Sequence, residues 1–182
     1  MATPIIAFVF ILSAIATAPK FSWTDNALSD LGVMTYPTNV IFNAGLIISG
    51  MLAMIFAVGL YLSFNESVLG RCGATIFLFC AIALFAIGVF SENMEPMHVF
   101  ASVAFFGLFP ISMCVLMFAY FTLGSQKRAV FTITAAAFAA LVWVVEFLFR
   151  YVPGVAIPET LSALSVSLWT MVIGFMISRS SN

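Results

Sequence analysis

The sequence is poor in charge, since only 7% of its 182 residues are Asp, Glu, Lys or Arg and the net charge is −1. Its six basic residues form no cluster, which excludes nucleic acid as a partner. The single histidine, His98, excludes sites that need two, such as a bis-histidine haem or a His-Glu-x-x-His zinc site. Both lysines lie at the ends of apolar runs, so no retinal Schiff base is expected. The three cysteines have neither disulfide nor metal-knuckle spacing.

Hydrophobic residues, in contrast, make up 64% of the chain, far above the usage of soluble globular proteins. An apolar window of about 17 to 25 residues is long enough to cross a bilayer core. The sequence therefore predicts an all-α integral membrane protein, a single domain over residues 1–182 built as a bundle of six transmembrane helices. The windows cover residues 3–19, 40–63, 72–91, 97–123, 129–151 and 160–178.

The basic residues predict the orientation, because positive charge accumulates in cytoplasmic loops. With six spans both termini share one side, and that side carries more of the basic residues, so we expect both termini to be cytoplasmic in a prokaryotic plasma membrane. The residues on the terminal side are Arg71, Lys127, Arg128 and Arg179, against Lys20 and Arg150 on the other. The first window also fits a signal peptide, but no positive charge precedes it.

Acidic residues gather on the opposite, outer side, and only Glu66 lies on the terminal side. A cluster of carboxylates over one face of an apolar bundle indicates a polar site at that face. The acidic residues concerned are Asp25, Asp30, Glu92, Glu95, Glu146 and Glu159.

The first loop predicts a short amphipathic interfacial helix over residues 25–31. Thr24 is a suitable N-cap, Gly32 a suitable C′ residue, and Trp23 and Leu28 have the spacing of a hydrophobic staple. Asp30 would lie in the last turn of this helix, where the helix dipole disfavours a negative charge. Asp30 is therefore either simply solvated or paired with a cation.

The third loop predicts a helix start at Glu95-Pro96, which places His98 in the first turn. The dipole there favours neutral imidazole, so His98 is a candidate ligand or proton acceptor, or else a histidine hydrogen-bonded at the headgroup level. Carboxylates and one imidazole suit a divalent metal, although their spacing is no known signature. The predicted metal ligands are Asp30, Glu92, Glu95 and His98.

Glu146 is predicted to lie below the outer surface, inside the fifth span, with Arg150 one turn outward. An ionisable group at that depth is a functional candidate, and the alternative is a self-neutralising pair whose arginine reaches the interface. The catalytic candidates are Asp30, His98 and Glu146.

Other polar residues have the spacing to line a funnel from the outer face, or to form interhelical hydrogen bonds. Asn26, Ser29 and Asp30 would form one polar face of the short helix, leaning over the bundle as a lid. The predicted ligand-binding residues are Trp23, Asn26, Ser29, Asn43, Arg150, Ser162 and Ser165.

The segment Asn26-Ala27-Leu28-Ser29-Asp30-Leu31-Gly32, together with His98-Val99-Phe100-Ala101-Ser102-Val103-Ala104-Phe105-Phe106, resembles the family of small membrane proteins called domain of unknown function 998. The resemblance implies six membrane helices with a Ser-Asp-Leu-Gly loop, and Ser29, Asp30, Gly32 and His98 match its pattern. It implies no activity, but it favours Asp30 and His98 belonging to one site.

We therefore expect an outward-facing acidic site that binds a small amphiphilic or lipid-like ligand, with its transport or modification left open. One alternative is a metal-dependent or acid/base, hydrolase-like membrane enzyme that uses Asp30 and His98. Another is an accessory subunit of a larger membrane complex. The expected partners are membrane lipids, the amphiphile, and further copies of the chain or a larger complex, and a divalent metal is the only cofactor we consider.

Overall fold

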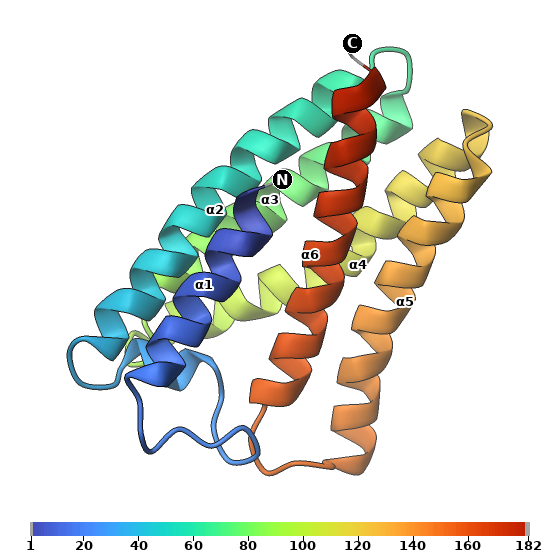
Figure 1. Cartoon of the computed structure of the whole chain (residues 1–182). Helices are drawn as coiled ribbons and strands as arrows, with labels where there is room; N and C mark the ends of the chain where they lie inside the picture. The colour runs from blue at the N-terminus through green and yellow to red at the C-terminus, as the bar shows by residue number, and fades with distance from the viewer. Residues whose placement is uncertain (1, 181–182) are drawn as a thin grey trace.

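The computed structural model describes residues 2–180, which form six α-helices and one short 3-10 helix without any strand (Figure 1). Each helix packs mainly on its neighbour in sequence, and α1 and α2 meet α6 more sparsely to close the bundle. The elements are α1 (Ala2–Ala16), η1 (Ser29–Gly32), α2 (Thr38–Ser63), α3 (Val68–Val89), α4 (Met97–Thr122), α5 (Gln126–Phe149) and α6 (Ala156–Ser180).

Five helices, α2 to α6, are long and apolar enough to cross a membrane, as expected of an integral membrane protein. The apolar first helix is shorter, with 15 residues, or about 22 Å at 1.5 Å per residue. The last helix begins at Ala156, whereas the predicted window begins at residue 160. Pro158 is tolerated in the first turn of a helix, and Glu159 and Thr160 continue that turn instead of forming a loop.

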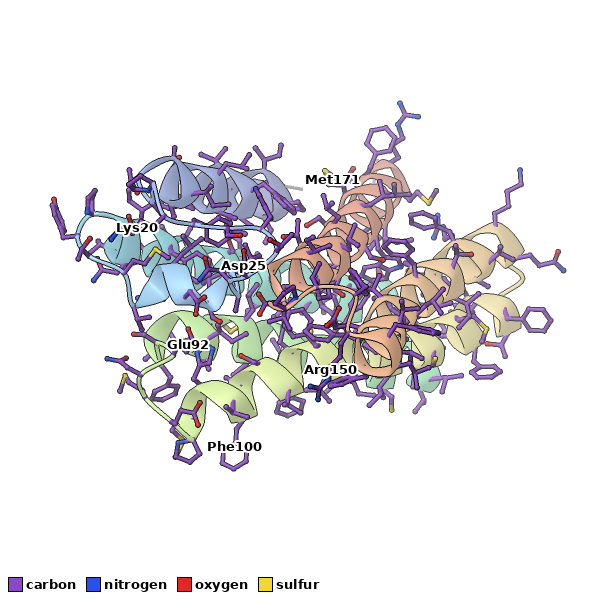
Figure 2. The ribbon with its side chains drawn as sticks, turned by 90° about the horizontal axis from the view of Figure 1, so that it is seen from below. Lys20, Asp25, Glu92, Phe100, Arg150 and Met171 are labelled. Atoms are coloured by element: carbon purple, nitrogen blue, oxygen red, sulfur yellow. The ribbon has the colours of Figure 1, made fainter. Side chains whose placement is uncertain are left out.

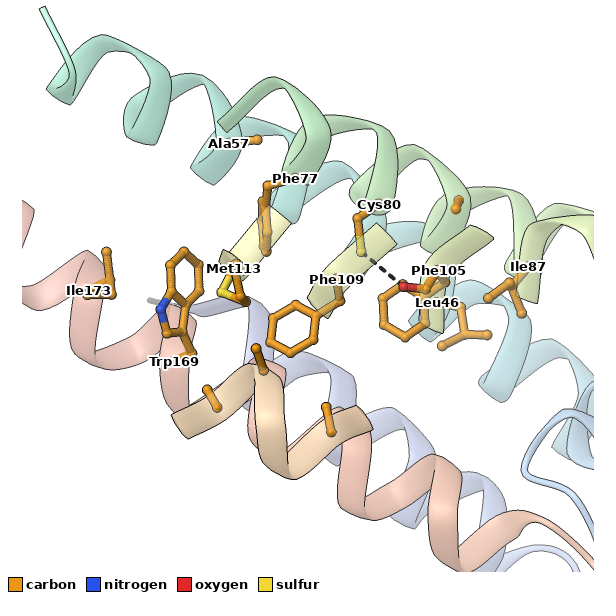
Figure 3. Packing of buried hydrophobic residues seen from close by; sticks show 14 of the residues in the cluster. Leu46, Ala57, Phe77, Cys80, Ile87, Phe105, Phe109, Met113, Trp169 and Ile173 are labelled. Atoms are coloured by element: carbon orange, nitrogen blue, oxygen red, sulfur yellow. Dashed lines mark hydrogen bonds between the residues drawn. The ribbon is translucent and has the colours of Figure 1, made fainter. Parts of the chain in front are cut away.

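Small and aromatic side chains fill the interior. Ala53, Ala57, Ala135 and Ala139 are buried, and their four-residue spacing on α2 and α5 lets neighbouring helices approach closely. At the centre Trp169 is fully buried, and its ring lies 5.5 Å from that of Phe77 and 6.0 Å from that of Phe56. Figure 3 shows Phe77, Met113 and Trp169 turned toward one another between the helices.

The first loop differs from its prediction. Only Ser29–Gly32 is helical, as a 3-10 turn, and the Thr24 hydroxyl donates to Asp25 instead of capping a helix. The backbone N–H of Ala27 donates to the Asp30 carboxylate, which fixes a turn where the predicted helix would run. Gly32 does not adopt the left-handed conformation expected of a C′ residue; a Cβ there would lie 2.6 Å from Asn43 Oδ1.

The two ends of the bundle differ in composition. We call the end formed by residues 17–37, 90–96 and 150–155 the acidic end, which is the lower end in Figure 1. The opposite end, with the turns at residues 64–67 and 123–125, is the basic end. Residues 17–37 form one long connection across the acidic end, which we call the cap loop (Figure 1).

Candidate ligand site at the acidic end

Three carboxylates from three distant segments meet at the acidic end: Asp30 of the cap loop, Glu92 between α3 and α4, and Glu159 of α6. The carboxyl group of Glu92 lies within hydrogen-bonding reach of Asp30. Glu159 lies close enough to both for electrostatic repulsion. The fold thus brings three acidic side chains into one region of the acidic end.

The cap loop is held over α6 by backbone hydrogen bonds. The N–H of Gly154 donates to the carbonyl of Thr24 at 2.7 Å, and the N–H of Ala156 donates to that of Asn26 at 2.9 Å. A Cβ on residue 154 would collide with the Asn26 backbone, so this contact requires glycine. The N–H of Leu28 donates to Glu159 Oε2 at 2.6 Å, which ties the loop directly to the carboxylate cluster.

Within the loop, Asp30 is oriented by two donors. The side-chain amide of Asn26 donates to Asp30 Oδ2 at 2.6 Å, and the N–H of Ala27 donates to the same oxygen at 3.0 Å. Because both donors are neutral, they fix the carboxylate in place without compensating its charge.

The electrostatics of Glu92 reflect this crowding. The pKa of Glu92 is raised to about 7, first by burial and then by hydrogen bonding to Asp30 and repulsion from Asp30 and Glu95. Its Oε2 is buried without a hydrogen-bond partner among residues 2–180. Asp25 behaves in the opposite way, because hydrogen bonds from Ser22 and Thr24 lower its pKa.

An elongated cavity of about 110 Å³ begins beside the cluster and runs between α1, α2, α3, α4 and α6. Its walls are mostly apolar, and Ser29, Ser102 and Glu159 line its polar end. Along α6 the lining extends from Glu159 to Thr170, a length of about 16 Å at 1.5 Å per residue. Phe77 lines the deep part of the cavity, and its ring packs against Trp169 of the buried core.

Ser49 is a polar exception in the apolar wall. Its side chain is 0% exposed, and its hydroxyl has no hydrogen-bond partner among residues 2–180. A buried hydroxyl without a partner is costly, so this position favours a polar atom inside the cavity.

On the outer surface of the bundle, a groove of about 390 Å³ follows the seam between α1 and α6. Pro4, Phe8 and Ser167 line both this groove and the cavity. The sparse contact between α1 and α6 therefore lies where the cavity and the groove share lining residues.

His98 lies in the first turn of α4, as predicted, but it has partners of its own. Its Nδ1 lies 2.8 Å from the carbonyl oxygen of Phe90, which only accepts, so Nδ1 carries the proton. Its Nε2 lies 3.4 Å from the hydroxyl of Ser102, which lines the cavity. His98 thus approaches the cavity through Ser102, and no hydrogen bond joins it to Asp30 within residues 2–180.

Of the four predicted metal ligands, Asp30 and Glu92 come together, whereas Glu95 is exposed and His98 bonds elsewhere. In the described part of the chain no group of three or more His, Cys, Asp or Glu side chains has an arrangement that could hold a metal ion. The metal hypothesis therefore stays a prediction without geometric support.

Glu146 is buried, and its Oε2 has no hydrogen-bond partner among residues 2–180. Arg150 ends α5 in a left-handed conformation, with φ of 42°, and its side chain is exposed. Within the described residues the alternative reading, a self-neutralising Glu146–Arg150 ion pair, is not formed, because α5 ends at Phe149 and the backbone changes direction at Arg150. Figure 2 shows Arg150 apart from Glu92 and Asp25 at this end.

The other predicted ligand-binding residues differ in their surroundings. Ser29 lines the cavity. Three have partners within the chain: Asn43 donates to the carbonyl of Gly32 at 2.9 Å, Ser165 donates to that of Ala135 at 2.9 Å, and Trp23 packs edge-on against Phe21. Ser162 is buried with no partner for its hydroxyl among the described residues, and it does not line the cavity. For Ser165 the alternative stated above, an interhelical hydrogen bond, is therefore correct, because it joins α6 to α5.

Ser49 and Ser102 are cavity-lining residues that were not among the predicted site residues, and Glu159 was named only among the acidic residues of the outer side. Glu159 and Ala163, one turn apart on α6, both line the cavity. Nothing in the sequence indicates that the backbone N–H of Leu28 donates to Glu159.

Neither a curated protein nor a solved structure shows significant similarity to the chain. A family model does match, over residues 1–176 and therefore nearly the whole sequence. The expected resemblance is thereby confirmed, and the chain belongs to the family described as protein of unknown function (DUF998).

Proposed function

We propose that this protein binds a small amphiphile, with the apolar part in the elongated cavity and the polar end beside Ser29, Ser102 and Glu159. The observation that carries the proposal is the cavity itself, which is narrow, about 16 Å long, apolar along its walls and polar at one end. Binding sites for small molecules typically combine apolar walls with a few placed polar groups.

The surroundings of the cavity support a ligand that comes from the bilayer. The groove between α1 and α6 shares part of its lining with the cavity, and its outer rim is apolar, with Ile5, Leu164 and Leu168 exposed. A chain lying in the membrane can reach the cavity through this seam without crossing water.

We further propose that α1 crosses the membrane as the first of six spans, so that both termini lie in the cytoplasm and the acidic end faces outward. Ile5, Val9 and Leu12 are exposed apolar side chains on α1, which suits contact with lipid. The basic end then carries Arg71, Lys127 and Arg128 on the cytoplasmic side.

The enzyme alternative has weaker support. A reaction that used Asp30 and His98 together would need both at one reacting atom, whereas Asp30 accepts from Asn26 and His98 bonds to Phe90. Binding needs no such convergence, and we therefore rank it first.

Photolabelling tests the proposal. A single-chain alcohol with a diazirine at its tail is added to the protein in nanodiscs, and labelled residues are identified by mass spectrometry. We expect labels on Phe77 and Phe105 in the cavity, and their loss in Ala163→Phe, which fills the cavity one turn below Glu159.

The matched control is Ala140→Phe, which adds the same bulk to an exposed position on α5. Labelling confined to lipid-facing residues, or equal in the two variants, would contradict the proposal.

A further inference from the structure

We infer that the amphiphile carries a positively charged head, a protonated amine, which binds between Asp30, Glu92 and Glu159 while its apolar chain occupies the cavity. This inference rests on the proposed function and specifies the chemical class of its ligand.

The first argument is uncompensated charge. No Lys, Arg or His nitrogen within residues 2–180 is in ion-pair contact with the three carboxylates. Lys20 and Arg150 belong to the same end of the bundle, but both are exposed (Figure 2). Three carboxyl groups this close repel one another when ionised, so a cation that the chain itself does not supply would stabilise their charged forms.

The second argument is independent of charge and concerns Ser49. This fully buried hydroxyl lines the cavity and has no partner among the described residues, although most buried polar groups in folded proteins do. The cavity therefore has two polar features, Glu159 at its end and Ser49 in its wall. Among the described residues, Leu28 donates to one oxygen of Glu159, and the hydroxyl of Ser49 has no partner.

The third argument is the match of donors and acceptors. Carboxylates only accept hydrogen bonds, and a protonated amine only donates them, through three N–H groups. Leu28 already donates to Oε2 of Glu159, which leaves the other oxygen of this cavity-lining carboxylate for the ligand. An alcohol head compensates no charge, and a carboxylate or phosphate head adds repulsion.

A metal ion is the competing cation, and the geometry disfavours it. Metal binding needs several ligand atoms converging at short distance, and no group of three His, Cys, Asp or Glu side chains within residues 2–180 is so arranged. An ammonium head tolerates the wider spacing because its N–H groups point in different directions.

The inference is tested by native mass spectrometry with three probes that share one tail: dodecylammonium, dodecanol and dodecanoate. Each is titrated into the purified full-length protein in the same nonionic detergent, so that competition from the detergent is equal. We expect dodecylammonium to bind at least about tenfold more tightly than either other probe.

Glu159→Gln should remove most of this preference, because its amide oxygen still accepts from Leu28 while the charge is lost. Asp30→Asn is a second variant with the same expectation, in case Glu159→Gln folds poorly. Glu66→Gln, an exposed carboxylate at the basic end, is the matched control and should keep the preference.

The possible outcomes separate the two proposals. If the three probes bind equally and all are lost in Ala163→Phe, the cavity binds amphiphiles but the inferred cationic head is wrong. If no probe binds, or binding is unchanged in Ala163→Phe, the proposed function itself fails. A cation preference that survives both Glu159→Gln and Asp30→Asn overturns the assignment of the head to these carboxylates.

Discussion

The two ends of the bundle use their charged residues differently. At the basic end Arg71 donates from Nε to the carbonyl of Phe64 at 3.1 Å and from Nη2 to that of Asn65 at 2.6 Å, and its guanidinium lies over the Tyr61 ring. Phe64 and Asn65 belong to the turn between α2 and α3, and Tyr61 belongs to the last turn of α2. The charge therefore serves to close a local connection between α2 and α3.

At the acidic end the charged residues come from three segments far apart in the sequence, and they meet one another instead of opposite charges. A fold does not need to bring like charges together, and stability alone would select against it. The basic end is thus organised for packing, and the meeting of like charges at the acidic end supports the proposal that this end binds a ligand.

The cap loop should be the more fragile connection, and a glycine pair tests this with the largest expected effect. Gly154→Ala places a methyl group against the Asn26 backbone and should cost about 1–3 kcal/mol of unfolding free energy. Gly59→Ala, in α2 near the basic end, meets nothing within 4 Å and should be neutral or gain up to about 1 kcal/mol.

Thermal unfolding of both variants in detergent measures the difference. Equal midpoints would mean that the cap loop is not held against residue 154 as tightly as the hydrogen bond at Gly154 indicates. Loss of amphiphile binding in Gly154→Ala alone would connect the loop to the site.

An arginine pair sharpens the comparison with a smaller effect. Arg71→Ala removes hydrogen bonds to two carbonyl oxygens and should lower the unfolding free energy by about 1 kcal/mol. Arg150→Ala, at an exposed side chain of the acidic end, should change it by less than about 0.5 kcal/mol. Neither change should alter the affinity for dodecylammonium, and a large loss of that affinity in Arg150→Ala would show that the acidic end is organised differently.

Much of the helical arrangement was predictable, because membrane spans are read from the length and apolarity of a segment. The windows at 40–63 and 97–123 nearly coincide with α2 and α4. The first loop was predicted less well. Capping signals at Thr24 and Gly32 describe local preference, whereas the loop conformation is decided by Ala27 and Asn26 donating to Asp30 and by α6 beneath it.

The site was predictable only in part, for a related reason. Asp30 and Glu92 were recognisable as acidic residues on one side of the membrane, because the number of spans before a loop fixes the side on which the loop lies. Their meeting with Glu159 depends on how α6 packs and on the Leu28 backbone, which no periodicity encodes. The alternative of a Glu146–Arg150 ion pair fails because it extends helical spacing through Arg150, the residue at which the helix ends.

The smallest expected effect concerns pH and Glu92. Its pKa is raised from 4.5 to about 7 in the folded protein, so between these values the folded state binds more protons than the unfolded state. Stability should therefore fall as pH rises through this window and remain lower above about 7. The effect is reduced by solvent screening, because Glu92 is partly exposed.

Thermal midpoints measured from about pH 5 to about pH 8 should decline in the wild type and decline less in Glu92→Gln, where Asp30, Glu95 and Glu159 no longer face a second titrating group at residue 92. Glu66→Gln, at the basic end, should follow the wild type. Because His98 is present in all of these proteins, a difference between their curves comes from Glu92 and not from the titration of His98.

Bound dodecylammonium should flatten the wild-type curve as well, because a cation beside Glu92 favours its ionised form and removes the cost of charging it. If the curve of Glu92→Gln matched that of the wild type without ligand, the carboxylates would not be coupled and the contrast between the two ends would lose its electrostatic basis.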